Sequence, residues 1–429
     1  MLLASRSGDL RGLWNRSAAS AAIAAPSASE EAAATREAIG VLEETARRDP
    51  EDALALNKLA GYYHHLLRET GALTYLDLSL RAADASITSV PVVRNTGGLS
   101  ALTLAEFSSH EFGKARDHAR QLAAIDPARS YPDEMLGDAL LELGEYGQAQ
   151  RAYKEMQRLS GGVDENGESR TARLALLRGD NSGALRHFSN ALAFQLKIFE
   201  PSRELIAWYY WQLGETDFAV GDYRAAEAAY RNALVTFPGY YRALASLGRV
   251  RAARGDFAEA IEQYRGAIRV LPDPLFVAAL GDLYQLSGRQ NDAQAQYGLV
   301  ELIGHLSVLT GVLYNRNIAL FHADHDIDVQ RAYVSAEREY AVRHDIYGAD
   351  AVAWTALKVG KIREAQVAMR AALRLGTQDA RLFYHAGLIA RASGNPVLAR
   401  AYLRRALALN PQFDPLQAIK ARRALAAMD

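Results

Sequence analysis

The chain has 429 residues, of which 49% are hydrophobic and 23% charged, values typical of a folded protein and far from those of a disordered one. Its 49 Lys and Arg residues balance 50 Asp and Glu residues, so there is no general electrostatic attraction to nucleic acid or to an anionic membrane, and any charged partner must meet a local patch. The absence of cysteine excludes disulfides, thiolate metal sites and cysteine nucleophiles.

The first 35 residues are rich in Ala and Ser, and we expect them to form a poorly ordered tail. As a secretory signal the segment is a poor match, because Asp9 interrupts its basic part and small residues replace the Leu-rich core. We therefore slightly favour a cytoplasmic location, with an exported or periplasmic one as the alternative. The longest apolar stretch, 302–315, is shorter than the ~20 residues that span a bilayer, and it predicts a buried helix.

From about Ala38 onward, the same residue types recur at a nearly constant interval. The series Leu213-Gly214, Gly221-Asp222-Tyr223, Ala226, Tyr230, Ala233 and Pro238 is repeated as Leu247-Gly248, Gly255-Asp256-Phe257, Ala260, Tyr264, Ala267 and Pro272. One small residue marks the first helix of each unit, and in chain order the markers are Ala60, Thr103, Gly137, Ala172, Gly214, Gly248, Gly281, Ala319, Ala353 and Gly387. These markers predict ten helical hairpins.

The pattern resembles the tetratricopeptide repeat, and its C-terminal part, from Tyr314 to Phe413, also resembles repeats of uncharacterised bacterial proteins. The resemblance implies an all-α, right-handed superhelical solenoid of about ten units over residues 36–429, with a capping helix near the C-terminus. Gly-rich residues 161–168 could form a hinge between two halves, although a surface loop in one continuous superhelix is the interpretation that we favour.

Elementary packing supports this prediction. A Gly or Ala marker allows two helices to cross closely, and the aromatic residue of the second helix, such as Tyr230 or Tyr264, lies on an apolar stripe with period i, i+4, i+7. In the turn of Gly221-Asp222, Gly can adopt the left-handed conformation that ends one helix, and the acidic residue can cap the next. Nothing in the sequence indicates a β-strand.

No motif in the sequence indicates catalysis. Gly113-Lys114 and Gly360-Lys361 lack the Ser or Thr of a phosphate-binding loop. The segment from His322 to Asp328 carries two His and three Asp residues, but it fails the spacing of a calcium loop and reads more naturally as a polar turn than as a zinc site. We therefore predict neither an enzyme nor a site for a metal or cofactor.

The inner wall of such a solenoid is the expected binding surface, because each first helix exposes one stripe along it. The candidate residues on this stripe are Arg173, Trp208, Trp211, Glu215, Arg242, Arg249 and Asp282, with a second group at Asp350, Trp354 and Tyr384. Two Trp flanked by three Arg are typical of an interaction hot spot for an acidic or carboxylate-ended peptide. An equally weighted alternative is that both Trp residues pack between neighbouring units.

The leading hypothesis is a non-catalytic scaffold or adaptor that binds a peptide or protein segment in this groove. The alternatives are a peptide-sensing regulator and an accessory factor in the assembly of an exported or envelope complex. We expect protein or peptide partners and no nucleic acid, and the sequence leaves the oligomeric state open.

Overall fold

The protein is an array of α-helices. The computed structural model describes residues 28–309 and 316–428, and within these ranges there is no β-strand. The helices are α1 (Ala28–Arg48), α2 (Ala53–Thr70), α3 (Leu73–Ser89), α4 (Thr96–Ser108), α5 (Phe112–Ile125), α6 (Tyr131–Glu142), α7 (Tyr146–Leu159), α8 (Glu165–Leu177), α9 (Asn181–Gln195), α10 (Arg203–Ala219), α11 (Tyr223–Thr236), α12 (Tyr241–Ala253), α13 (Phe257–Val270), α14 (Pro274–Leu286), α15 (Gln290–Leu309), α16 (Arg316–His325), α17 (Val329–Tyr340), α18 (Ile346–Lys358), α19 (Ile362–Ala372), α20 (Ala380–Ala392), α21 (Pro396–Leu409) and α22 (Gln417–Ala426), with a 3₁₀ turn at Val92–Arg94.

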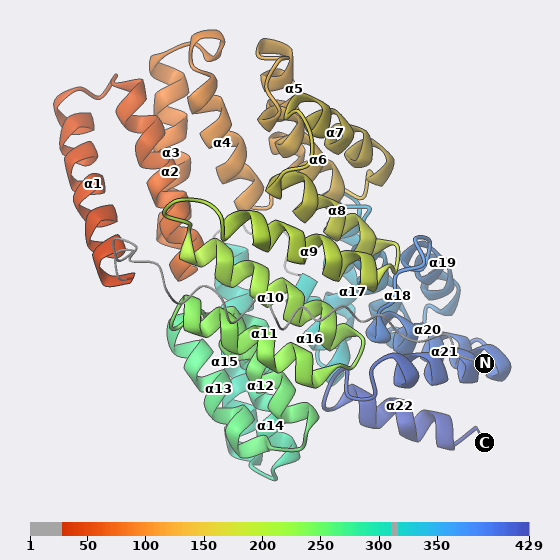
Figure 1. Ribbon diagram of the computed structural model, residues 1–429. Helices are drawn as coiled ribbons and strands as arrows, with labels where there is room; N and C mark the ends of the chain where they lie inside the picture. Colours follow the sequence, from red (N-terminus) through yellow and green to blue (C-terminus); the bar gives the residue numbers. More distant parts are fainter. Residues whose placement is uncertain (1–27, 310–315, 429) are drawn as a thin grey trace, which may run out of the picture.

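The described helices from α2 to α21 form ten consecutive hairpins, with α1 before the first and α22 after the last (Figure 1). The prediction of an all-α solenoid of ten units is therefore confirmed. Helix α1 begins at Ala28, so it includes the last residues of the segment 1–35 that we expected to be a tail. The rest of that segment, residues 1–27, lies outside the described residues. The proposed hinge at 161–168 covers the loop between α7 and α8 together with the first turn of α8, and it stays a prediction.

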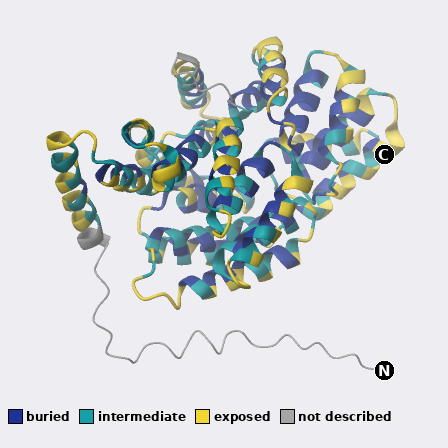
Figure 2. Ribbon diagram, turned by 90° about the horizontal axis from the view of Figure 1, so that it is seen from above, coloured by how far each residue is buried: buried dark blue, intermediate teal, exposed yellow. Residues whose placement is uncertain are grey.

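The glycine markers are required by the close approach of the two helices in a hairpin. A Cβ atom built on Gly214 would lie 2.4 Å from the ring of Tyr230, and one on Gly248 would lie 2.7 Å from the ring of Tyr264. Both distances are too short for real contacts, so the aromatic ring of the second helix occupies the space that any larger side chain would need. Buried residues accordingly follow the interior of the stack (Figure 2).

The turns within hairpins mostly follow the expected chemistry. Gly221 has a φ of 78°, and the Asp222 side chain then accepts a hydrogen bond from the backbone N–H of Ala225 at the start of α11. Asp256 caps α13 in the same way. Glu145 is an exception, because its side chain makes no capping hydrogen bond to α7.

The apolar stretch at 302–315 differs from its prediction as a buried helix. Helix α15 continues to Leu309, but the side chains of Leu302 and Leu306 are half exposed. Residues 310–315 lie outside the described residues. The end of α15 therefore carries apolar side chains on its surface.

The solenoid also contacts itself across a large sequence separation. Three hairpin turns, those of α6/α7, α8/α9 and α10/α11, meet the segments before α18, α20 and α22, at separations of 187 to 201 residues. The segments before α18 and α20 consequently lie against the turns that follow α6 and α8. We call these three contacts the closing contacts.

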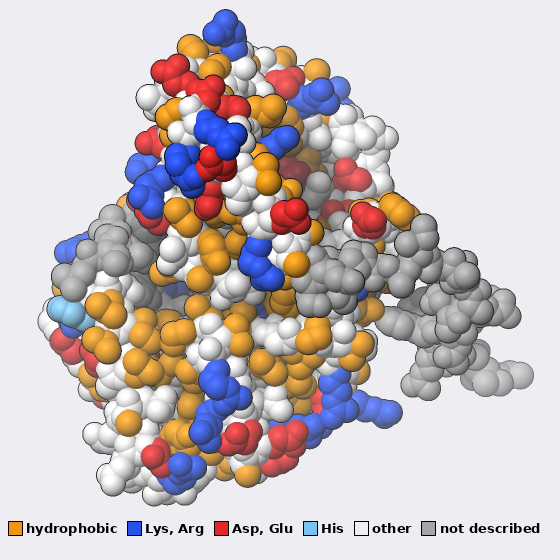
Figure 3. Space-filling view, turned by 90° about the vertical axis from the view of Figure 1, so that its left-hand side faces the viewer, with side chains coloured by type: hydrophobic (Ala, Val, Ile, Leu, Met, Phe, Trp, Pro, Cys, Tyr) orange, Lys and Arg blue, Asp and Glu red, His pale blue; other side chains and the backbone are white. Residues whose placement is uncertain are grey.

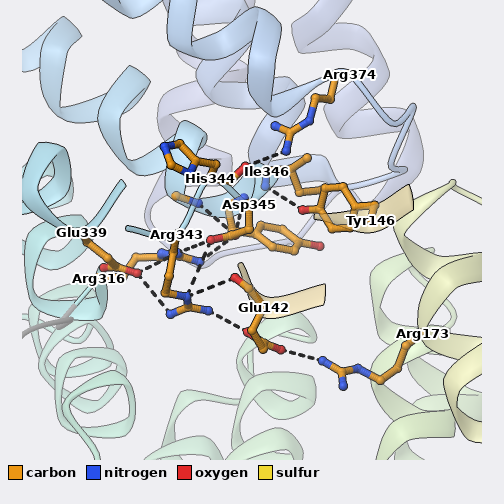
Figure 4. Close-up of polar contacts among 12 residues, drawn as sticks. Glu142, Tyr146, Arg173, Arg316, Glu339, Arg343, His344, Asp345, Ile346 and Arg374 are labelled. Atoms are coloured by element: carbon orange, nitrogen blue, oxygen red, sulfur yellow. Dashed lines mark hydrogen bonds and ion pairs between the residues drawn. The ribbon is translucent and has the colours of Figure 1, made fainter. Parts of the chain in front are cut away.

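The first closing contact centres on Glu142 at the end of α6 (Figure 4). One carboxylate oxygen of Glu142 accepts a hydrogen bond from Arg343 at 2.7 Å, and the other accepts one from Arg173, also at 2.7 Å. Close by, the backbone N–H of His344 donates to the carbonyl oxygen of Leu143 at 3.1 Å. A Cβ atom on Gly144 would lie 2.4 Å from the His344 backbone, so this turn needs glycine for space as well as for its φ of 80°.

The other two closing contacts are also hydrogen bonds to backbone groups. Thr377 donates its hydroxyl to the carbonyl oxygen of Leu177. The Asn410 amide donates to the carbonyl oxygen of Phe218 at 2.6 Å and accepts a hydrogen bond from the Tyr223 hydroxyl, also at 2.6 Å. Successive turns of the superhelix are thereby held together along one side.

Candidate binding cavity

The closed superhelix surrounds a cavity of about 570 Å³. Its wall is built from the inner sides of α10, α12, α14 and α16, the start of α20, and the segment that precedes α22. Five of the residues predicted for the groove line it: Trp211, Glu215, Arg242, Arg249 and Asp282. Residues predicted from the first helices of successive hairpins thus line the same cavity.

Arg249 and Glu215 form an internal ion pair in this wall. The guanidinium of Arg249 lies 2.5 Å from the Glu215 carboxylate and 4.0 Å above the ring of Phe218. Glu215 also accepts hydrogen bonds from the hydroxyls of Tyr230 and Ser246. Burial alone would raise the pKa of Glu215, but Arg249 and these two donors outweigh burial and lower it. Arg249 is therefore already neutralised by the chain.

Arg242 differs from Arg249, because among the described residues it forms no ion pair with a carboxylate. Its guanidinium lies 5.2 Å from the rings of both Trp211 and Tyr241, in the range of a cation–π contact, and the side chain is exposed toward the cavity. Arg242 is thus a cation that is positioned by aromatic rings, and its charge also interacts with that of Asp273 without forming an ion pair.

Acidic groups dominate the remaining wall of the cavity. Besides Glu215 they are Asp273, Asp282, Asp324, Asp379 and Asp414, and they face Arg381 and His325. Burial raises the pKa of Asp273, of Asp282 and of Asp379. The expectation of a strongly cationic groove is therefore wrong, because most of its arginines are paired and carboxylates outnumber them.

His325 has an oxygen atom within hydrogen-bond distance of each ring nitrogen. Its Nδ1 lies 2.8 Å from the carbonyl oxygen of Phe321, and its Nε2 lies 2.7 Å from the carboxylate of Asp282. Two acceptors of this kind favour the imidazolium, in which both nitrogens donate. Burial would lower the pKa of His325, but the hydrogen bond and charge of Asp282 prevail and raise it.

The two predicted Trp residues have different positions. Trp211 lines the cavity, and its indole N–H donates to the Ser246 hydroxyl at 3.0 Å. Trp208 is partly buried against the rings of Phe188 and Tyr209, at ring-centroid distances of 6.1 and 5.0 Å. The packing alternative therefore describes Trp208, whereas Trp211 both packs and faces the cavity.

Arg173 lies outside this cavity. It pairs with Glu142 at 2.7 Å and lies 3.7 Å from Asp138, so it belongs to the first closing contact (Figure 4). The structure does not bring it together with Arg242 and Arg249. The predicted cluster of three arginines is therefore not formed.

The second predicted group lies in the core and offers no groove surface. Trp354 is 1% exposed, stacks on His385 at 4.2 Å and donates its indole N–H to Asp324 at 2.9 Å. Tyr384 is fully buried, and Asp350 accepts a hydrogen bond from His385 at 2.8 Å. Their expected position on the groove is wrong, because α18 and α20 pack these faces against neighbouring helices.

Sequence reasoning missed the part of the wall contributed by Asp379, Ala380 and residues 410–415. Arg381 pairs with Asp414 at 2.8 Å, and Phe413 adds an aromatic ring to the cavity. These residues approach α10 and α12 only through the closing contacts, which a repeat pattern does not encode. A sequence signal existed for Asp379 alone, as the capping residue of α20.

The two His residues weighed as zinc ligands are engaged separately. His322 contacts Glu301, and His325 contacts Asp282. Of the described helices, none is both long and apolar enough to cross a membrane.

We compared the chain with protein-family models, with curated proteins and with solved structures. The family model described as tetratricopeptide repeat matches residues 31–87, 211–273 and 352–412. No curated protein matches the sequence. The solved structure of MamA is 20% identical with a TM-score of 0.33, over 40% of this chain and 96% of MamA. That of PilW, described as a widely conserved type IV pilus biogenesis factor, is 13% identical with a TM-score of 0.41, over 48% of this chain and 91% of PilW. The three matched parts of the array are therefore tetratricopeptide repeats, and similar helical hairpins continue between them.

Proposed function

We propose that this protein is a non-catalytic scaffold or adaptor that binds a peptide or protein segment in its central cavity. The presence of tetratricopeptide repeats supports a role in protein–protein interaction. The observation that carries the specific site is Arg242, a cavity-facing cation that has no carboxylate partner among the described residues and rests on aromatic rings. Such a group is available to a ligand without breaking an internal ion pair.

The chemistry of the wall defines the segment that would fit. A carboxylate or carbonyl group of the ligand would accept hydrogen bonds from Arg242, and an apolar side chain would pack against Trp211 and Phe276. A uniformly acidic segment is disfavoured, because it would meet the carboxylates of the opposite wall, including Asp282 and Asp414. The preferred ligand therefore has one acidic or terminal carboxylate beside apolar residues.

Selection of peptides from a random library tests this proposal. Peptides enriched by the wild-type protein should bind Arg242→Gln roughly thirtyfold more weakly, the loss expected for one hot-spot residue. The matched control is Arg265→Gln, which removes the same charge from an exposed site on α13. Unchanged melting temperatures would show that both variants are folded. Equal binding of the selected peptides to wild type and Arg242→Gln would contradict the proposed site.

A peptide-sensing regulator is the second candidate, and Asn410 favours it. This residue lines the cavity and also makes the third closing contact, with Phe218 and Tyr223. A ligand that displaces the Asn410 side chain would loosen that contact. If selected peptides change the radius of gyration of the wild-type protein, sensing is supported; if they bind without any change, the simple adaptor role stands.

A further inference from the structure

The C-terminal part of the array has a charge balance unlike that of the whole chain. Between Lys358 and Met428 the sequence has thirteen Lys and Arg residues but three Asp and Glu residues. The complete chain has 49 basic and 50 acidic residues, so the preceding part carries an acidic excess. The near-zero net charge therefore conceals a strongly basic end of the molecule.

The exposed basic side chains of this part lie mostly on α19, α21 and α22. On α19, the exposed residues Arg363, Val367 and Arg370 recur at i, i+4 and i+7, which places them on one face of the helix, and Arg374 is exposed in the turn that follows α19. The buried residues of α19, such as Ala365 and Met369, lie on its other side. The exposed face of α19 thus carries two arginines, and a third follows in the next turn.

The next outer helices extend this surface. Arg404 and Arg405 are exposed on α21, and Lys420, Arg422 and Arg423 are exposed on α22. Here we define the basic C-terminal surface as Arg363, Arg370, Arg374, Arg404, Arg405, Lys420, Arg422 and Arg423.

Much of this positive charge is not paired with carboxylates of the protein itself. Arg363, Arg370 and Arg423 form no ion pair with a described residue. Arg374 and Arg422 donate instead to backbone carbonyl oxygens, those of His344 and Pro411 respectively. On the face opposite to these helices, by contrast, basic and acidic side chains are interspersed (Figure 3).

The side chains between the arginines indicate which polyanion fits. Val367, Val397 and Leu398 are exposed by 59%, 70% and 42%. In the described residues from Lys358 onward, the aromatic rings are buried or partly buried, so no exposed ring offers a stacking platform for nucleic-acid bases. Exposed aliphatic side chains among basic ones are typical of surfaces that lie on lipid headgroups.

We propose that the basic C-terminal surface binds anionic lipid membranes, which leaves the central cavity available for a protein ligand. Phospholipid headgroups with a net negative charge would contact the arginines of α19, α21 and α22, and the aliphatic side chains would reach the headgroup boundary. The proposal does not depend on the function assigned to the cavity, because none of these surface residues lines it.

Vesicle flotation tests this inference with the full-length chain. The probes are vesicles of phosphatidylcholine alone and vesicles containing phosphatidylserine, each at low and at physiological salt. Wild-type protein should float with the anionic vesicles only, and less at the higher salt because ions screen the attraction. Each basic side chain near an anionic surface contributes about fivefold in affinity, so the variant Arg363→Gln/Arg370→Gln/Arg423→Gln should bind on the order of a hundredfold more weakly.

A matched control removes three exposed arginines elsewhere. Arg47→Gln/Arg158→Gln/Arg265→Gln has the same net charge, and its three positions have exposed side chains outside the basic C-terminal surface. This variant should keep wild-type binding. Absence of flotation with anionic vesicles, equal flotation with neutral ones, or an equal loss in the control would overturn the proposal. So would salt-sensitive binding to a DNA or RNA oligonucleotide, lost in the first variant, without vesicle binding.

Discussion

At the scale of single residues, the positions of the marker glycines are the least tolerant of a larger side chain. Four of the five marker glycines contact an aromatic ring of the following helix, and Gly387 contacts Leu403 instead. A ring cannot shorten or bend away as a long aliphatic chain can. Gly248 lies against Tyr264 in this way, whereas Gly298 on α15 has no atom within 4 Å of the position of a Cβ. These two glycines therefore form a natural pair for comparison.

Gly248→Leu should destabilise the protein by about 1–3 kcal/mol or more, because the new side chain overpacks the crossing of α12 and α13. Thermal or denaturant unfolding followed by circular dichroism measures this loss. Gly298→Leu should leave stability unchanged or slightly increased, since Leu favours the helix more than Gly does. Equal effects of the two substitutions would show that the crossing is not tightly packed.

His325 predicts a pH dependence of stability. Its pKa is higher in the folded than in the unfolded protein because of Asp282, so its stabilising contribution is complete below the ordinary His pKa of about 6.5 and disappears as the pH rises through the folded value. His325→Gln should therefore cost about 1.5–3 kcal/mol of unfolding free energy near pH 6 and less near pH 9.

The control for this prediction is His305→Gln on the exposed side of α15, which should leave the pH dependence of unfolding unaltered. A stability difference between wild type and His325→Gln that stays constant across this pH range would mean that His325 is neutral in the folded protein.

At the scale of elements, the first closing contact joins α6 to α17 and α18 through buried charges. Arg343 contacts Glu142 at 2.7 Å and Glu339 at 3.2 Å, and Arg316 contacts both Glu339 and Asp345 (Figure 4). Glu339 and Asp345 are 3% and 5% exposed. Removing one partner from a buried ion network costs unfolding free energy, because the charge that loses its partner remains buried.

Arg343→Ala should reduce the unfolding free energy by about 3–5 kcal/mol, the range for removing one partner of a buried pair. Arg158→Ala is the matched control, because Arg158 makes only an exposed i, i+3 pair with Glu155, and it should change stability by less than about 1 kcal/mol. Chemical denaturation measures both. Comparable losses would show that the Arg343 network is as exposed as the surface pair.

At the scale of the whole molecule, the closing contacts determine the shape of the array. A repeat solenoid is held together mainly by neighbouring units, and contacts between distant units add a second constraint. Here Glu142, Thr377 and Asn410 each bridge segments that lie about two hundred residues apart. The wall of the cavity depends on the same arrangement, since residues 410–415 contribute to it.

The combined variant Glu142→Gln/Thr377→Ala/Asn410→Ala should open the superhelix. Its radius of gyration, measured by small-angle X-ray scattering, should increase while the helical circular dichroism signal is retained, because the hairpins keep their own cores. A variant with three exposed polar substitutions, Ser182→Ala/Gln148→Ala/Ser189→Ala, serves as control. An unchanged radius of gyration would mean that other contacts keep the array closed.

The sequence alone determined the units of this protein. Helix periodicity, the Gly–aromatic pairs such as Gly214 and Tyr230, and the capping residues of the turns all act between residues that are close along the chain. They therefore predicted the ten hairpins and the convergence of Trp211 and Arg242 on the inner wall. The same local rules did not predict that α1 begins as early as Ala28, because an Ala-rich segment can be helical or disordered depending on its surroundings.

Only the tertiary structure decided which predicted site residues are available. Arg173 and Arg249 are neutralised by Glu142 and Glu215, and Trp354 is buried, because their partners lie on other helices of the array. The closing contacts join segments so far apart in the chain that no repeat period encodes them. Local pattern thus fixes what each unit is, whereas the pitch of the superhelix, a sum of small rotations between units, determines which distant side chains meet.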